Sequence, residues 1–173
     1  MARRLRRRFL PSTRANNHAL RWLPDGRLIY VLVENDRVRL DEIDLANLEI
    51  HALQAWDFDV TSTWQPVIAP DGDKFVISAV RPNALTSDLY LFQRDSSDVI
   101  NITQLGTSNE TQPVWSSDSR RIVYKLLTGS GQLVVVVDAD GSNEHVLFEH
   151  PSMRISDLNW SPDDTRVSFV LSP

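Results

Sequence analysis

Short apolar runs, separated by polar residues, glycine and proline, recur from about residue 18 to the end of the chain. They last about five to seven residues and are rich in Val, Ile, Leu, Tyr and Phe, which is typical of strands. No stretch of ten or more residues places its apolar residues at helical spacing. The pattern therefore predicts an all-β protein.

One turn-forming phrase occurs four times, each time just before an apolar run. The four copies are LRWLPDGRLIY (20–30), PVIAPDGDKFVIS (66–78), PVWSSDSRRIVY (113–124) and LNWSPDDTRVSF (158–169). Their central aspartates, at spacings of 46, 47 and 45 residues, are Asp25, Asp71, Asp118 and Asp163. Four strands of about six residues with connections of about five reproduce this period. Each repeat is therefore expected to form one four-stranded antiparallel sheet, the blade of a β-propeller.

The repeats divide the chain into a short tail and four units. We expect a basic, disordered tail over residues 1–17 and propeller units at about 18–54, 62–105, 109–149 and 155–171. The predicted fold is a partial β-propeller of about three four-stranded antiparallel blades plus two strands of a fourth. The missing strands are expected from outside this chain, in a longer propeller or through self-association of two copies. A third alternative is an open arc of sheets.

Large side chains close the first strand of most units. Trp22, Trp115 and Trp160 stand at this position, and Ile68 replaces tryptophan in the second unit. A large ring at this place can fill the wedge between neighbouring blades. We therefore expect these residues to be structural.

The turn phrase itself has a clear conformational purpose. Its aspartate can accept backbone N–H groups within the turn, and Gly26 and Gly72 supply the positive φ that a tight hairpin requires. Ser119 and Asp164 occupy the glycine position in the last two units. Because serine tolerates a left-handed backbone less well than aspartate, the third unit is expected to use a different turn.

At QPVWSSDSRRIVY, LVVVVDADGSNEHVLF and LNWSPDDTRVSF the sequence resembles the TolB-like β-propeller repeats, a WD-type family. The family pattern is approximately Pro-x-Trp-Ser-Pro-Asp-Gly, an apolar strand, a second ending in Asp-x-Asp-Gly, and a third ending in Leu-Thr. The resemblance covers about residues 18–173. It implies blades whose strands run from the axis outward, in rings of six or seven, and members that are often periplasmic. It is specific for fold and says little about function.

Charge is distributed unevenly between the tail and the body. Residues 1–21 contain seven arginines and no acidic residue, whereas residues 22–173 contain 11 basic and 23 acidic residues, a net charge of −12. Such a body repels phosphate backbones, so we expect no nucleic acid to bind it.

Targeting signals are incomplete in this sequence. RRRFL (6–10) is similar to the twin-arginine export pattern, but PSTRANNHAL follows it where an apolar segment is required. No apolar run approaches the roughly 18 residues of a membrane helix. We expect no membrane span and, by default, a cytoplasmic location.

The residues that carry most enzyme chemistry are absent or badly spaced. The chain has no cysteine, no Gly-x-Ser-x-Gly elbow and no phosphate-binding glycine loop. Asp138–Gly141 resembles the centre of a calcium loop but lacks the outer ligands, and is expected to form a hairpin. The histidines, which lack zinc spacing, are His18, His51, His145 and His150. We expect no catalysis, metal or cofactor, although some sugar-acid lyases of this propeller class bind a metal through histidine near the axis.

A partner is expected on the face that collects residues 54–63, 81–88 and 106–112, because loops on a rigid scaffold usually carry function. The candidate contact residues are Trp56, Phe58, Arg81, Asn83, Asp88 and Glu110. Trp56 and Phe58 can anchor a partner or tuck over the blade edges. The sequence therefore predicts a non-catalytic scaffold that binds a protein or peptide. The alternative is the accessory or gating propeller of a prolyl-oligopeptidase-type serine peptidase whose catalytic domain lies outside this chain.

Overall fold

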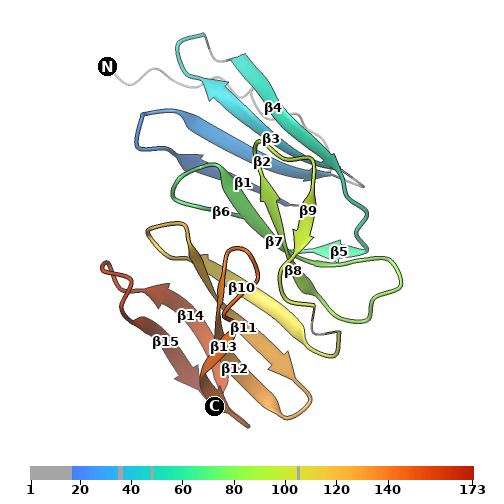
Figure 1. Ribbon diagram of the computed structural model, residues 1–173, viewed down its shortest axis with the longest axis vertical. Coiled ribbons are helices and arrows are strands. Elements are labelled where there is room, and N and C mark those ends of the chain that lie inside the picture. The colour runs from blue at the N-terminus through green and yellow to red at the C-terminus, as the bar shows by residue number, and fades with distance from the viewer. Residues whose placement is uncertain (1–16, 35–36, 48, 105) are drawn as a thin grey trace.

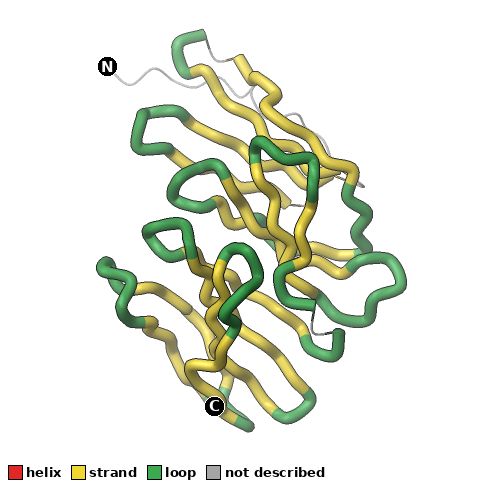
Figure 2. The backbone as a smooth tube through the Cα atoms, viewed as in Figure 1, coloured by secondary structure: helices red, strands yellow, loops and turns green. Residues whose placement is uncertain are grey.

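The structure is a computed structural model that describes residues 17–34, 37–47, 49–104 and 106–173. These residues form four antiparallel sheets and no helix. The sheets follow one another along the chain and stack along the long axis of the molecule (Figures 1 and 2). The prediction of an all-β, partial propeller is confirmed. The tail expected over residues 1–17 lies, except for Asn17, outside the described residues.

Three of the sheets contain at least four strands and the last contains two. The first has the order β1 (Asn17–Trp22), β2 (Leu28–Glu34), β3 (Arg37–Asp44) and β4 (Glu49–Asp57). The second contains β5 (Ser62–Thr63), β6 (Val67–Ile68), β7 (Lys74–Val80), β8 (Asp88–Gln93) and β9 (Val99–Asn101), with β5 and β6 both paired to β7. The third has the order β10 (Asn109–Trp115), β11 (Arg121–Thr128), β12 (Gly131–Asp138) and β13 (His145–His150). The fourth pairs β14 (Arg154–Trp160) with β15 (Val167–Ser172).

The same tight turn opens every sheet. The residue at the glycine position has a left-handed backbone in all four, with φ values of 86°, 76°, 60° and 54° at Gly26, Gly72, Ser119 and Asp164. Its N–H donates to the carbonyl three residues earlier, at 2.9 to 3.1 Å. The expectation of a different turn in the third unit is therefore wrong. Ser119 adopts this left-handed conformation although serine is strained there, because its hydroxyl accepts a hydrogen bond from the Asp71 N–H on the second sheet.

The apolar core lies between the sheets. Trp56, Phe75 and Phe92 meet between the first and second sheets. Leu91 and Tyr124 pack between the second and third sheets. Each junction buries the face of two sheets, so each sheet is stabilised mainly by its neighbours.

The predicted wedge is present at two of the three tryptophan positions. The indole Nε1 of Trp115 donates to the carbonyl of Val67 at 2.9 Å, and that of Trp160 donates to the carbonyl of Val114 at 3.0 Å. Each ring thus reaches the first strand of the preceding sheet. For Trp22 the expectation is wrong within the described residues. That side chain is 61% exposed, because no described sheet precedes it.

Candidate interaction face

The two ends of the stacked sheets carry different kinds of connection. The tight turns and the connections after β3, β8 and β12 lie at one end, which we call the turn face. The other end carries the segments 58–61, 81–87 and 106–108, which we call the loop face. The β1–β2 and β14–β15 turns lie on the left in Figure 1, and the β7–β8 loop projects on the right.

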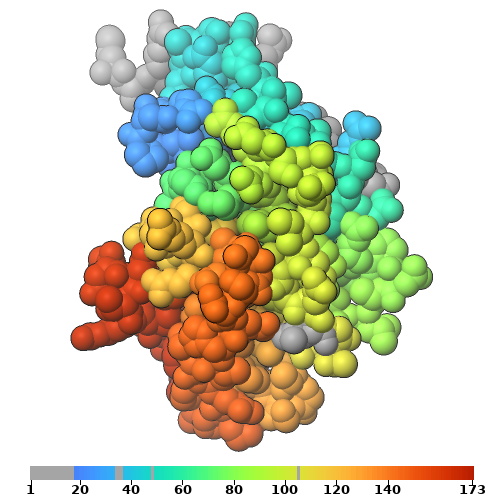
Figure 3. Space-filling model, viewed as in Figure 1, coloured from blue at the N-terminus to red at the C-terminus, as the bar shows by residue number. Residues whose placement is uncertain are grey.

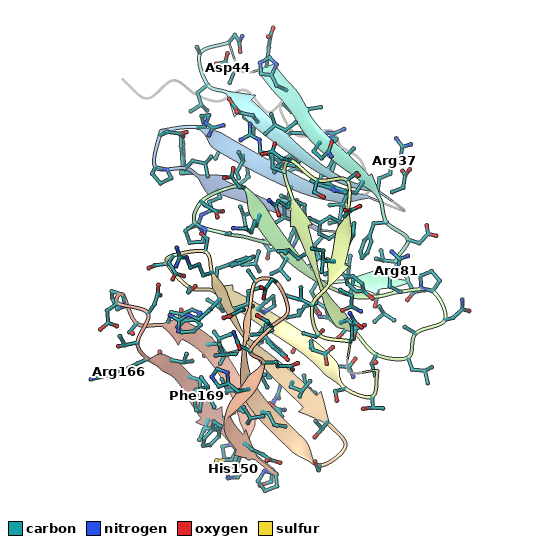
Figure 4. All side chains as sticks on the ribbon, viewed as in Figure 1. Arg37, Asp44, Arg81, His150, Arg166 and Phe169 are labelled. Carbon is teal, nitrogen blue, oxygen red and sulfur yellow. The ribbon has the colours of Figure 1, made fainter. Side chains whose placement is uncertain are left out.

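The β7–β8 loop presents an apolar tip on an anchored base. Leu85 is 96% exposed, and the loop that carries it forms a bulge on the right edge in Figure 3. At its start the Arg81 guanidinium lies over the Phe58 ring, 4.6 Å from the centroid, and the Arg81 carbonyl accepts the Ala84 N–H at 3.0 Å. Arg81 is labelled beside this loop in Figure 4. At its end, Ser87 N–H donates to Asn109 Oδ1 at 3.1 Å.

Trp56 and Phe58 are not exposed anchors, so this part of the prediction is wrong and the alternative, that they tuck over the blade edge, is right. Trp56 is 3% exposed and its indole Nε1 donates to the Ser96 carbonyl at 2.8 Å. Phe58 is buried edge-on against Tyr90 and Phe92. The sequence assigned residue 56 to a loop, whereas β4 continues to Asp57 and lays its apolar side chains on the second sheet.

Two other candidate contact residues also lie inside. Glu110 is fully buried, so it cannot act as a surface contact as predicted. It belongs to β10, which begins at Asn109, inside the segment that the sequence assigned to a loop. Asp88 is half-buried and accepts the Asn101 side-chain N–H at 2.7 Å. Burial and the charge of Asp88 raise the pKa of Glu110. Of the six residues, only Arg81 and Asn83 belong to the projecting loop.

The turn aspartates are occupied within their own turns. Asp25, Asp71 and Asp118 each accept the backbone N–H of the residue two positions later at 3.0 Å. Asp163 accepts the equivalent Thr165 N–H at 3.2 Å. The Arg27 N–H and guanidinium lower the pKa of Asp25. The hydroxyls of Ser116 and Ser161, together with the turn N–H groups, lower the pKa values of Asp118 and Asp163. The arrangement is that of a turn scaffold.

The residues that replace glycine connect one sheet to the next, which the sequence reading missed. The Ser119 hydroxyl accepts the Asp71 N–H at 3.0 Å. One carboxylate oxygen of Asp164 accepts the Ser117 N–H at 2.9 Å, and the other accepts the Ser117 hydroxyl at 2.6 Å and the Asp118 N–H at 3.2 Å. The only signal in the sequence was the departure from glycine itself.

No metal centre is formed by the described residues. They contain no group of three or more His, Asp or Glu side chains arranged to hold an ion. His51 and His145 lie on the outer strands β4 and β13, away from the first strands. Asp138–Gly141 closes the β12–β13 hairpin, with the Gly141 N–H donating to the Asp138 carbonyl at 2.9 Å. Among these same residues there is no helix that could span a membrane.

The stacked sheets and their repeated turns define the chain as a partial β-propeller. No protein-family model and no curated protein sequence matches the chain. Among solved structures, TolB from Acinetobacter baumannii is 19% identical with a TM-score of 0.62, over 87% of this chain and 36% of that one. A prolyl endopeptidase structure is 15% identical with a TM-score of 0.63, over 90% of this chain and 26% of the other. A chain of a nidogen/laminin complex is 11% identical with a TM-score of 0.61, over 87% and 54% of the two chains.

The fold is that of the TolB-like propellers. The similar structures also include the tricorn protease, an oligogalacturonate lyase and a puromycin hydrolase, each longer than this chain. This chain spans about a third of the length of TolB and about a quarter of that of the prolyl endopeptidase.

Proposed function

We propose that the chain is a non-catalytic propeller scaffold that binds a protein or peptide through its loop face. The observation that carries this proposal is the exposed Leu85 at the tip of a loop that is fixed at both ends. An apolar side chain on a fixed base loses little conformational freedom when it enters a partner's pocket. Because the turn aspartates are used within their own turns, the loop face is the better candidate for recognition.

The acidic body of the chain and the mixed apolar and polar surface of the loop favour a protein over a nucleic acid as the partner. The body of the chain is acidic, so a phosphate backbone would be repelled from most of its surface. Apolar contact through Leu85 and hydrogen bonds to the side chain of Asn83 suit a pocket with a polar rim. The propellers that this fold resembles include a chain from a structure of two proteins in complex.

The test places a photo-crosslinking amino acid at position 85 of the full chain, expressed in its source cells. The matched control carries the same group at position 100, where Ile100 is exposed on the outer strand β9. We expect a discrete crosslinked protein from position 85 only. An excess of unlabelled wild-type chain should reduce this crosslink, whereas an excess of the Leu85→Asp chain should not. Equal crosslinking from both positions would contradict recognition through the loop face.

The alternative function is the accessory propeller of a serine peptidase. Its support is the likeness to the prolyl endopeptidase structure, of which this chain covers 26%. The coding sequence on both sides of this segment separates the two proposals. A downstream Gly-x-Ser-x-Gly followed by Asp and His favours the peptidase, whereas further propeller repeats alone favour the scaffold.

Self-association is a second mode of partner binding that the fold supports. Beside β15 lies a groove of about 400 Å³, lined by Phe148, Trp160 and Phe169 among others. Phe169 is labelled in the fourth sheet in Figure 4. Sedimentation over a range of concentrations tests this mode, since association predicts a mass that rises with concentration, and a constant monomer mass would exclude it.

A further inference from the structure

Two carboxyl groups, those of Glu110 and Asp88, lie at the junction of the second and third sheets. Among the described residues only one of their four oxygens, Asp88 Oδ2, accepts a hydrogen bond, from the Asn101 side chain at 2.7 Å and the Tyr90 hydroxyl at 3.4 Å. Both carboxyl oxygens of Glu110 are buried and lack a hydrogen-bond partner among the described residues. The same is true of Asp88 Oδ1. An unpaired buried carboxylate is costly, and two close together are costlier, so one of the pair must be neutralised.

We propose that Glu110 and Asp88 share one proton across this junction, and that the proton acts as a pH-sensitive latch on the β7–β8 loop. With one proton present, the acid form of Glu110 donates a hydrogen bond to Asp88, and the pair carries a single negative charge. When the proton leaves, two negative charges face each other inside the stack. The shared proton and its effect on the loop do not depend on the proposed partner. Only the consequence that a displaced loop would bind a partner less well rests on the proposed function.

The surrounding groups favour a proton over a compensating cation. Asp88 and the phenol of Tyr90 approach from β8, and Glu144 and the phenol of Tyr124 approach from the third sheet. The Tyr124 hydroxyl is already engaged, since it donates to Glu144 at 2.5 Å. The Arg81 guanidinium, on the adjoining loop, is stacked over Phe58.

The electrostatics agree with this arrangement. Burial, followed by the charge of Asp88 and a hydrogen bond with it, raises the pKa of Glu110 to about 8, and Glu144 adds a smaller effect. Burial and then Asp88 likewise raise the pKa of Tyr90 to about 12. Both shifts indicate a junction that resists further negative charge.

The backbone of Glu110 connects the proton to the loop. The Glu110 N–H donates to the Ser87 carbonyl at 3.1 Å, and the Ser87 hydroxyl donates back to the Glu110 carbonyl at 3.1 Å. The Ser78 hydroxyl also donates to that carbonyl. Ser87 is the last residue of the segment that carries Leu85, so repulsion at the carboxyl pair acts directly on the loop's anchor.

The sign of the pH effect follows from the raised pKa. Because folded Glu110 keeps its proton to a higher pH than the ordinary value of 4.5, its contribution to stability is complete below about pH 4.5. The contribution falls as the pH rises towards about 8 and is then lost. One extra bound proton changes the folding equilibrium about tenfold per pH unit, so the total effect is on the order of a thousandfold.

The test compares urea unfolding of the wild-type chain and Glu110→Gln between about pH 5 and pH 9. The amide of glutamine can donate to Asp88 but cannot ionise. We expect the wild-type unfolding constant to rise on the order of a thousandfold more than that of Glu110→Gln over this interval. The matched control is Glu149→Gln on the outer strand β13, an exposed position, which should follow the wild type.

A second variant keeps the proposal testable if Glu110→Gln does not fold. Asp88→Asn removes the like charge, so it should reduce the pH dependence while leaving Glu110 in place. A wild-type slope in both variants would overturn the shared proton. Stabilisation of the wild type, but not of Glu110→Gln, by calcium or magnesium ions at neutral pH would also overturn it, because the pair would then be a metal site.

Loop exposure gives a separate readout of the latch. Hydrogen exchange of the peptide containing residues 81–88 should accelerate above about pH 8 in the wild type, relative to Glu110→Gln at the same pH. Equal exchange in the two chains would show that the carboxyl pair does not act on the loop.

Discussion

Replacement of Asp164 by glycine separates two explanations for the residue at the left-handed turn position. If aspartate is only an imperfect substitute for glycine, Asp164→Gly should stabilise the protein by roughly 1 kcal/mol, because glycine adopts a positive φ without strain. If its hydrogen bonds to the preceding sheet matter more, the same change should destabilise the protein. The two explanations predict opposite signs.

The structure favours destabilisation. Asp164 is 8% exposed and accepts three hydrogen bonds from Ser117 and Asp118 on the preceding turn. Bonds to a charged group contribute up to about 1.5–3 kcal/mol each, but water at the turn face weakens them, so we take about 1 kcal/mol each. After the roughly 1 kcal/mol gained from the relaxed backbone, Asp164→Gly should lower the free energy of unfolding by about 2 kcal/mol.

The assay is urea unfolding at neutral pH, followed by tryptophan fluorescence and far-ultraviolet circular dichroism. Ser119→Gly is the matched control, because Ser119 accepts one neutral hydrogen bond from the Asp71 N–H, and its loss should nearly cancel the relief of strain. We expect a lower midpoint for Asp164→Gly and a small change for Ser119→Gly. A higher midpoint for Asp164→Gly would refute the view that these residues hold neighbouring sheets together.

Two further predictions use the same unfolding assay. Trp115→Phe should cost about 2 kcal/mol, because it removes the hydrogen bond to the Val67 carbonyl and part of a buried ring, whereas Trp160→Phe should cost less since that ring is half-exposed. Gly72→Ala should lower the free energy of unfolding by about 2 kcal/mol, for two reasons. Residue 72 has a φ of +76°, which strains alanine, and the added Cβ would lie 2.2 Å from a Leu23 methyl carbon. If Trp115→Phe or Gly72→Ala left the free energy of unfolding unchanged, that result would contradict the packing described.

The repeated turn made most of the architecture predictable. Four aspartates at nearly equal spacing mark the first hairpin of each sheet, and an apolar run follows each of them as the next strand. The same local signal recurs four times, so errors at any one turn matter little. This is why the number and order of the sheets could be predicted without knowledge of any long-range contact.

The candidate site was harder to predict because its features depend on contacts between sheets. Trp56 and Glu110 are polar or aromatic residues beside loop signals, and only the packing of the neighbouring sheet shows that they are buried. The inner strands also contain irregularities at Gln112 and Asp157, which have φ values of 56° and 55° without a glycine to mark them. The loop that carries Leu85 is different, since the sequence predicted a connection at residues 81–88 and the structure has one between Val80 and Asp88.

The hydrogen-bonded tryptophans place one fluorophore at each junction between neighbouring sheets. Trp56 and Trp115 each donate a hydrogen bond to a carbonyl of the second sheet, one from either side, and Trp160 donates to a carbonyl of the third sheet. The chain has five tryptophans, so variants that keep one of these three, with phenylalanine at the other four tryptophan positions, would emit from one junction at a time. Stepwise loss of the three signals during denaturation would then reveal whether the sheets separate one by one or all together.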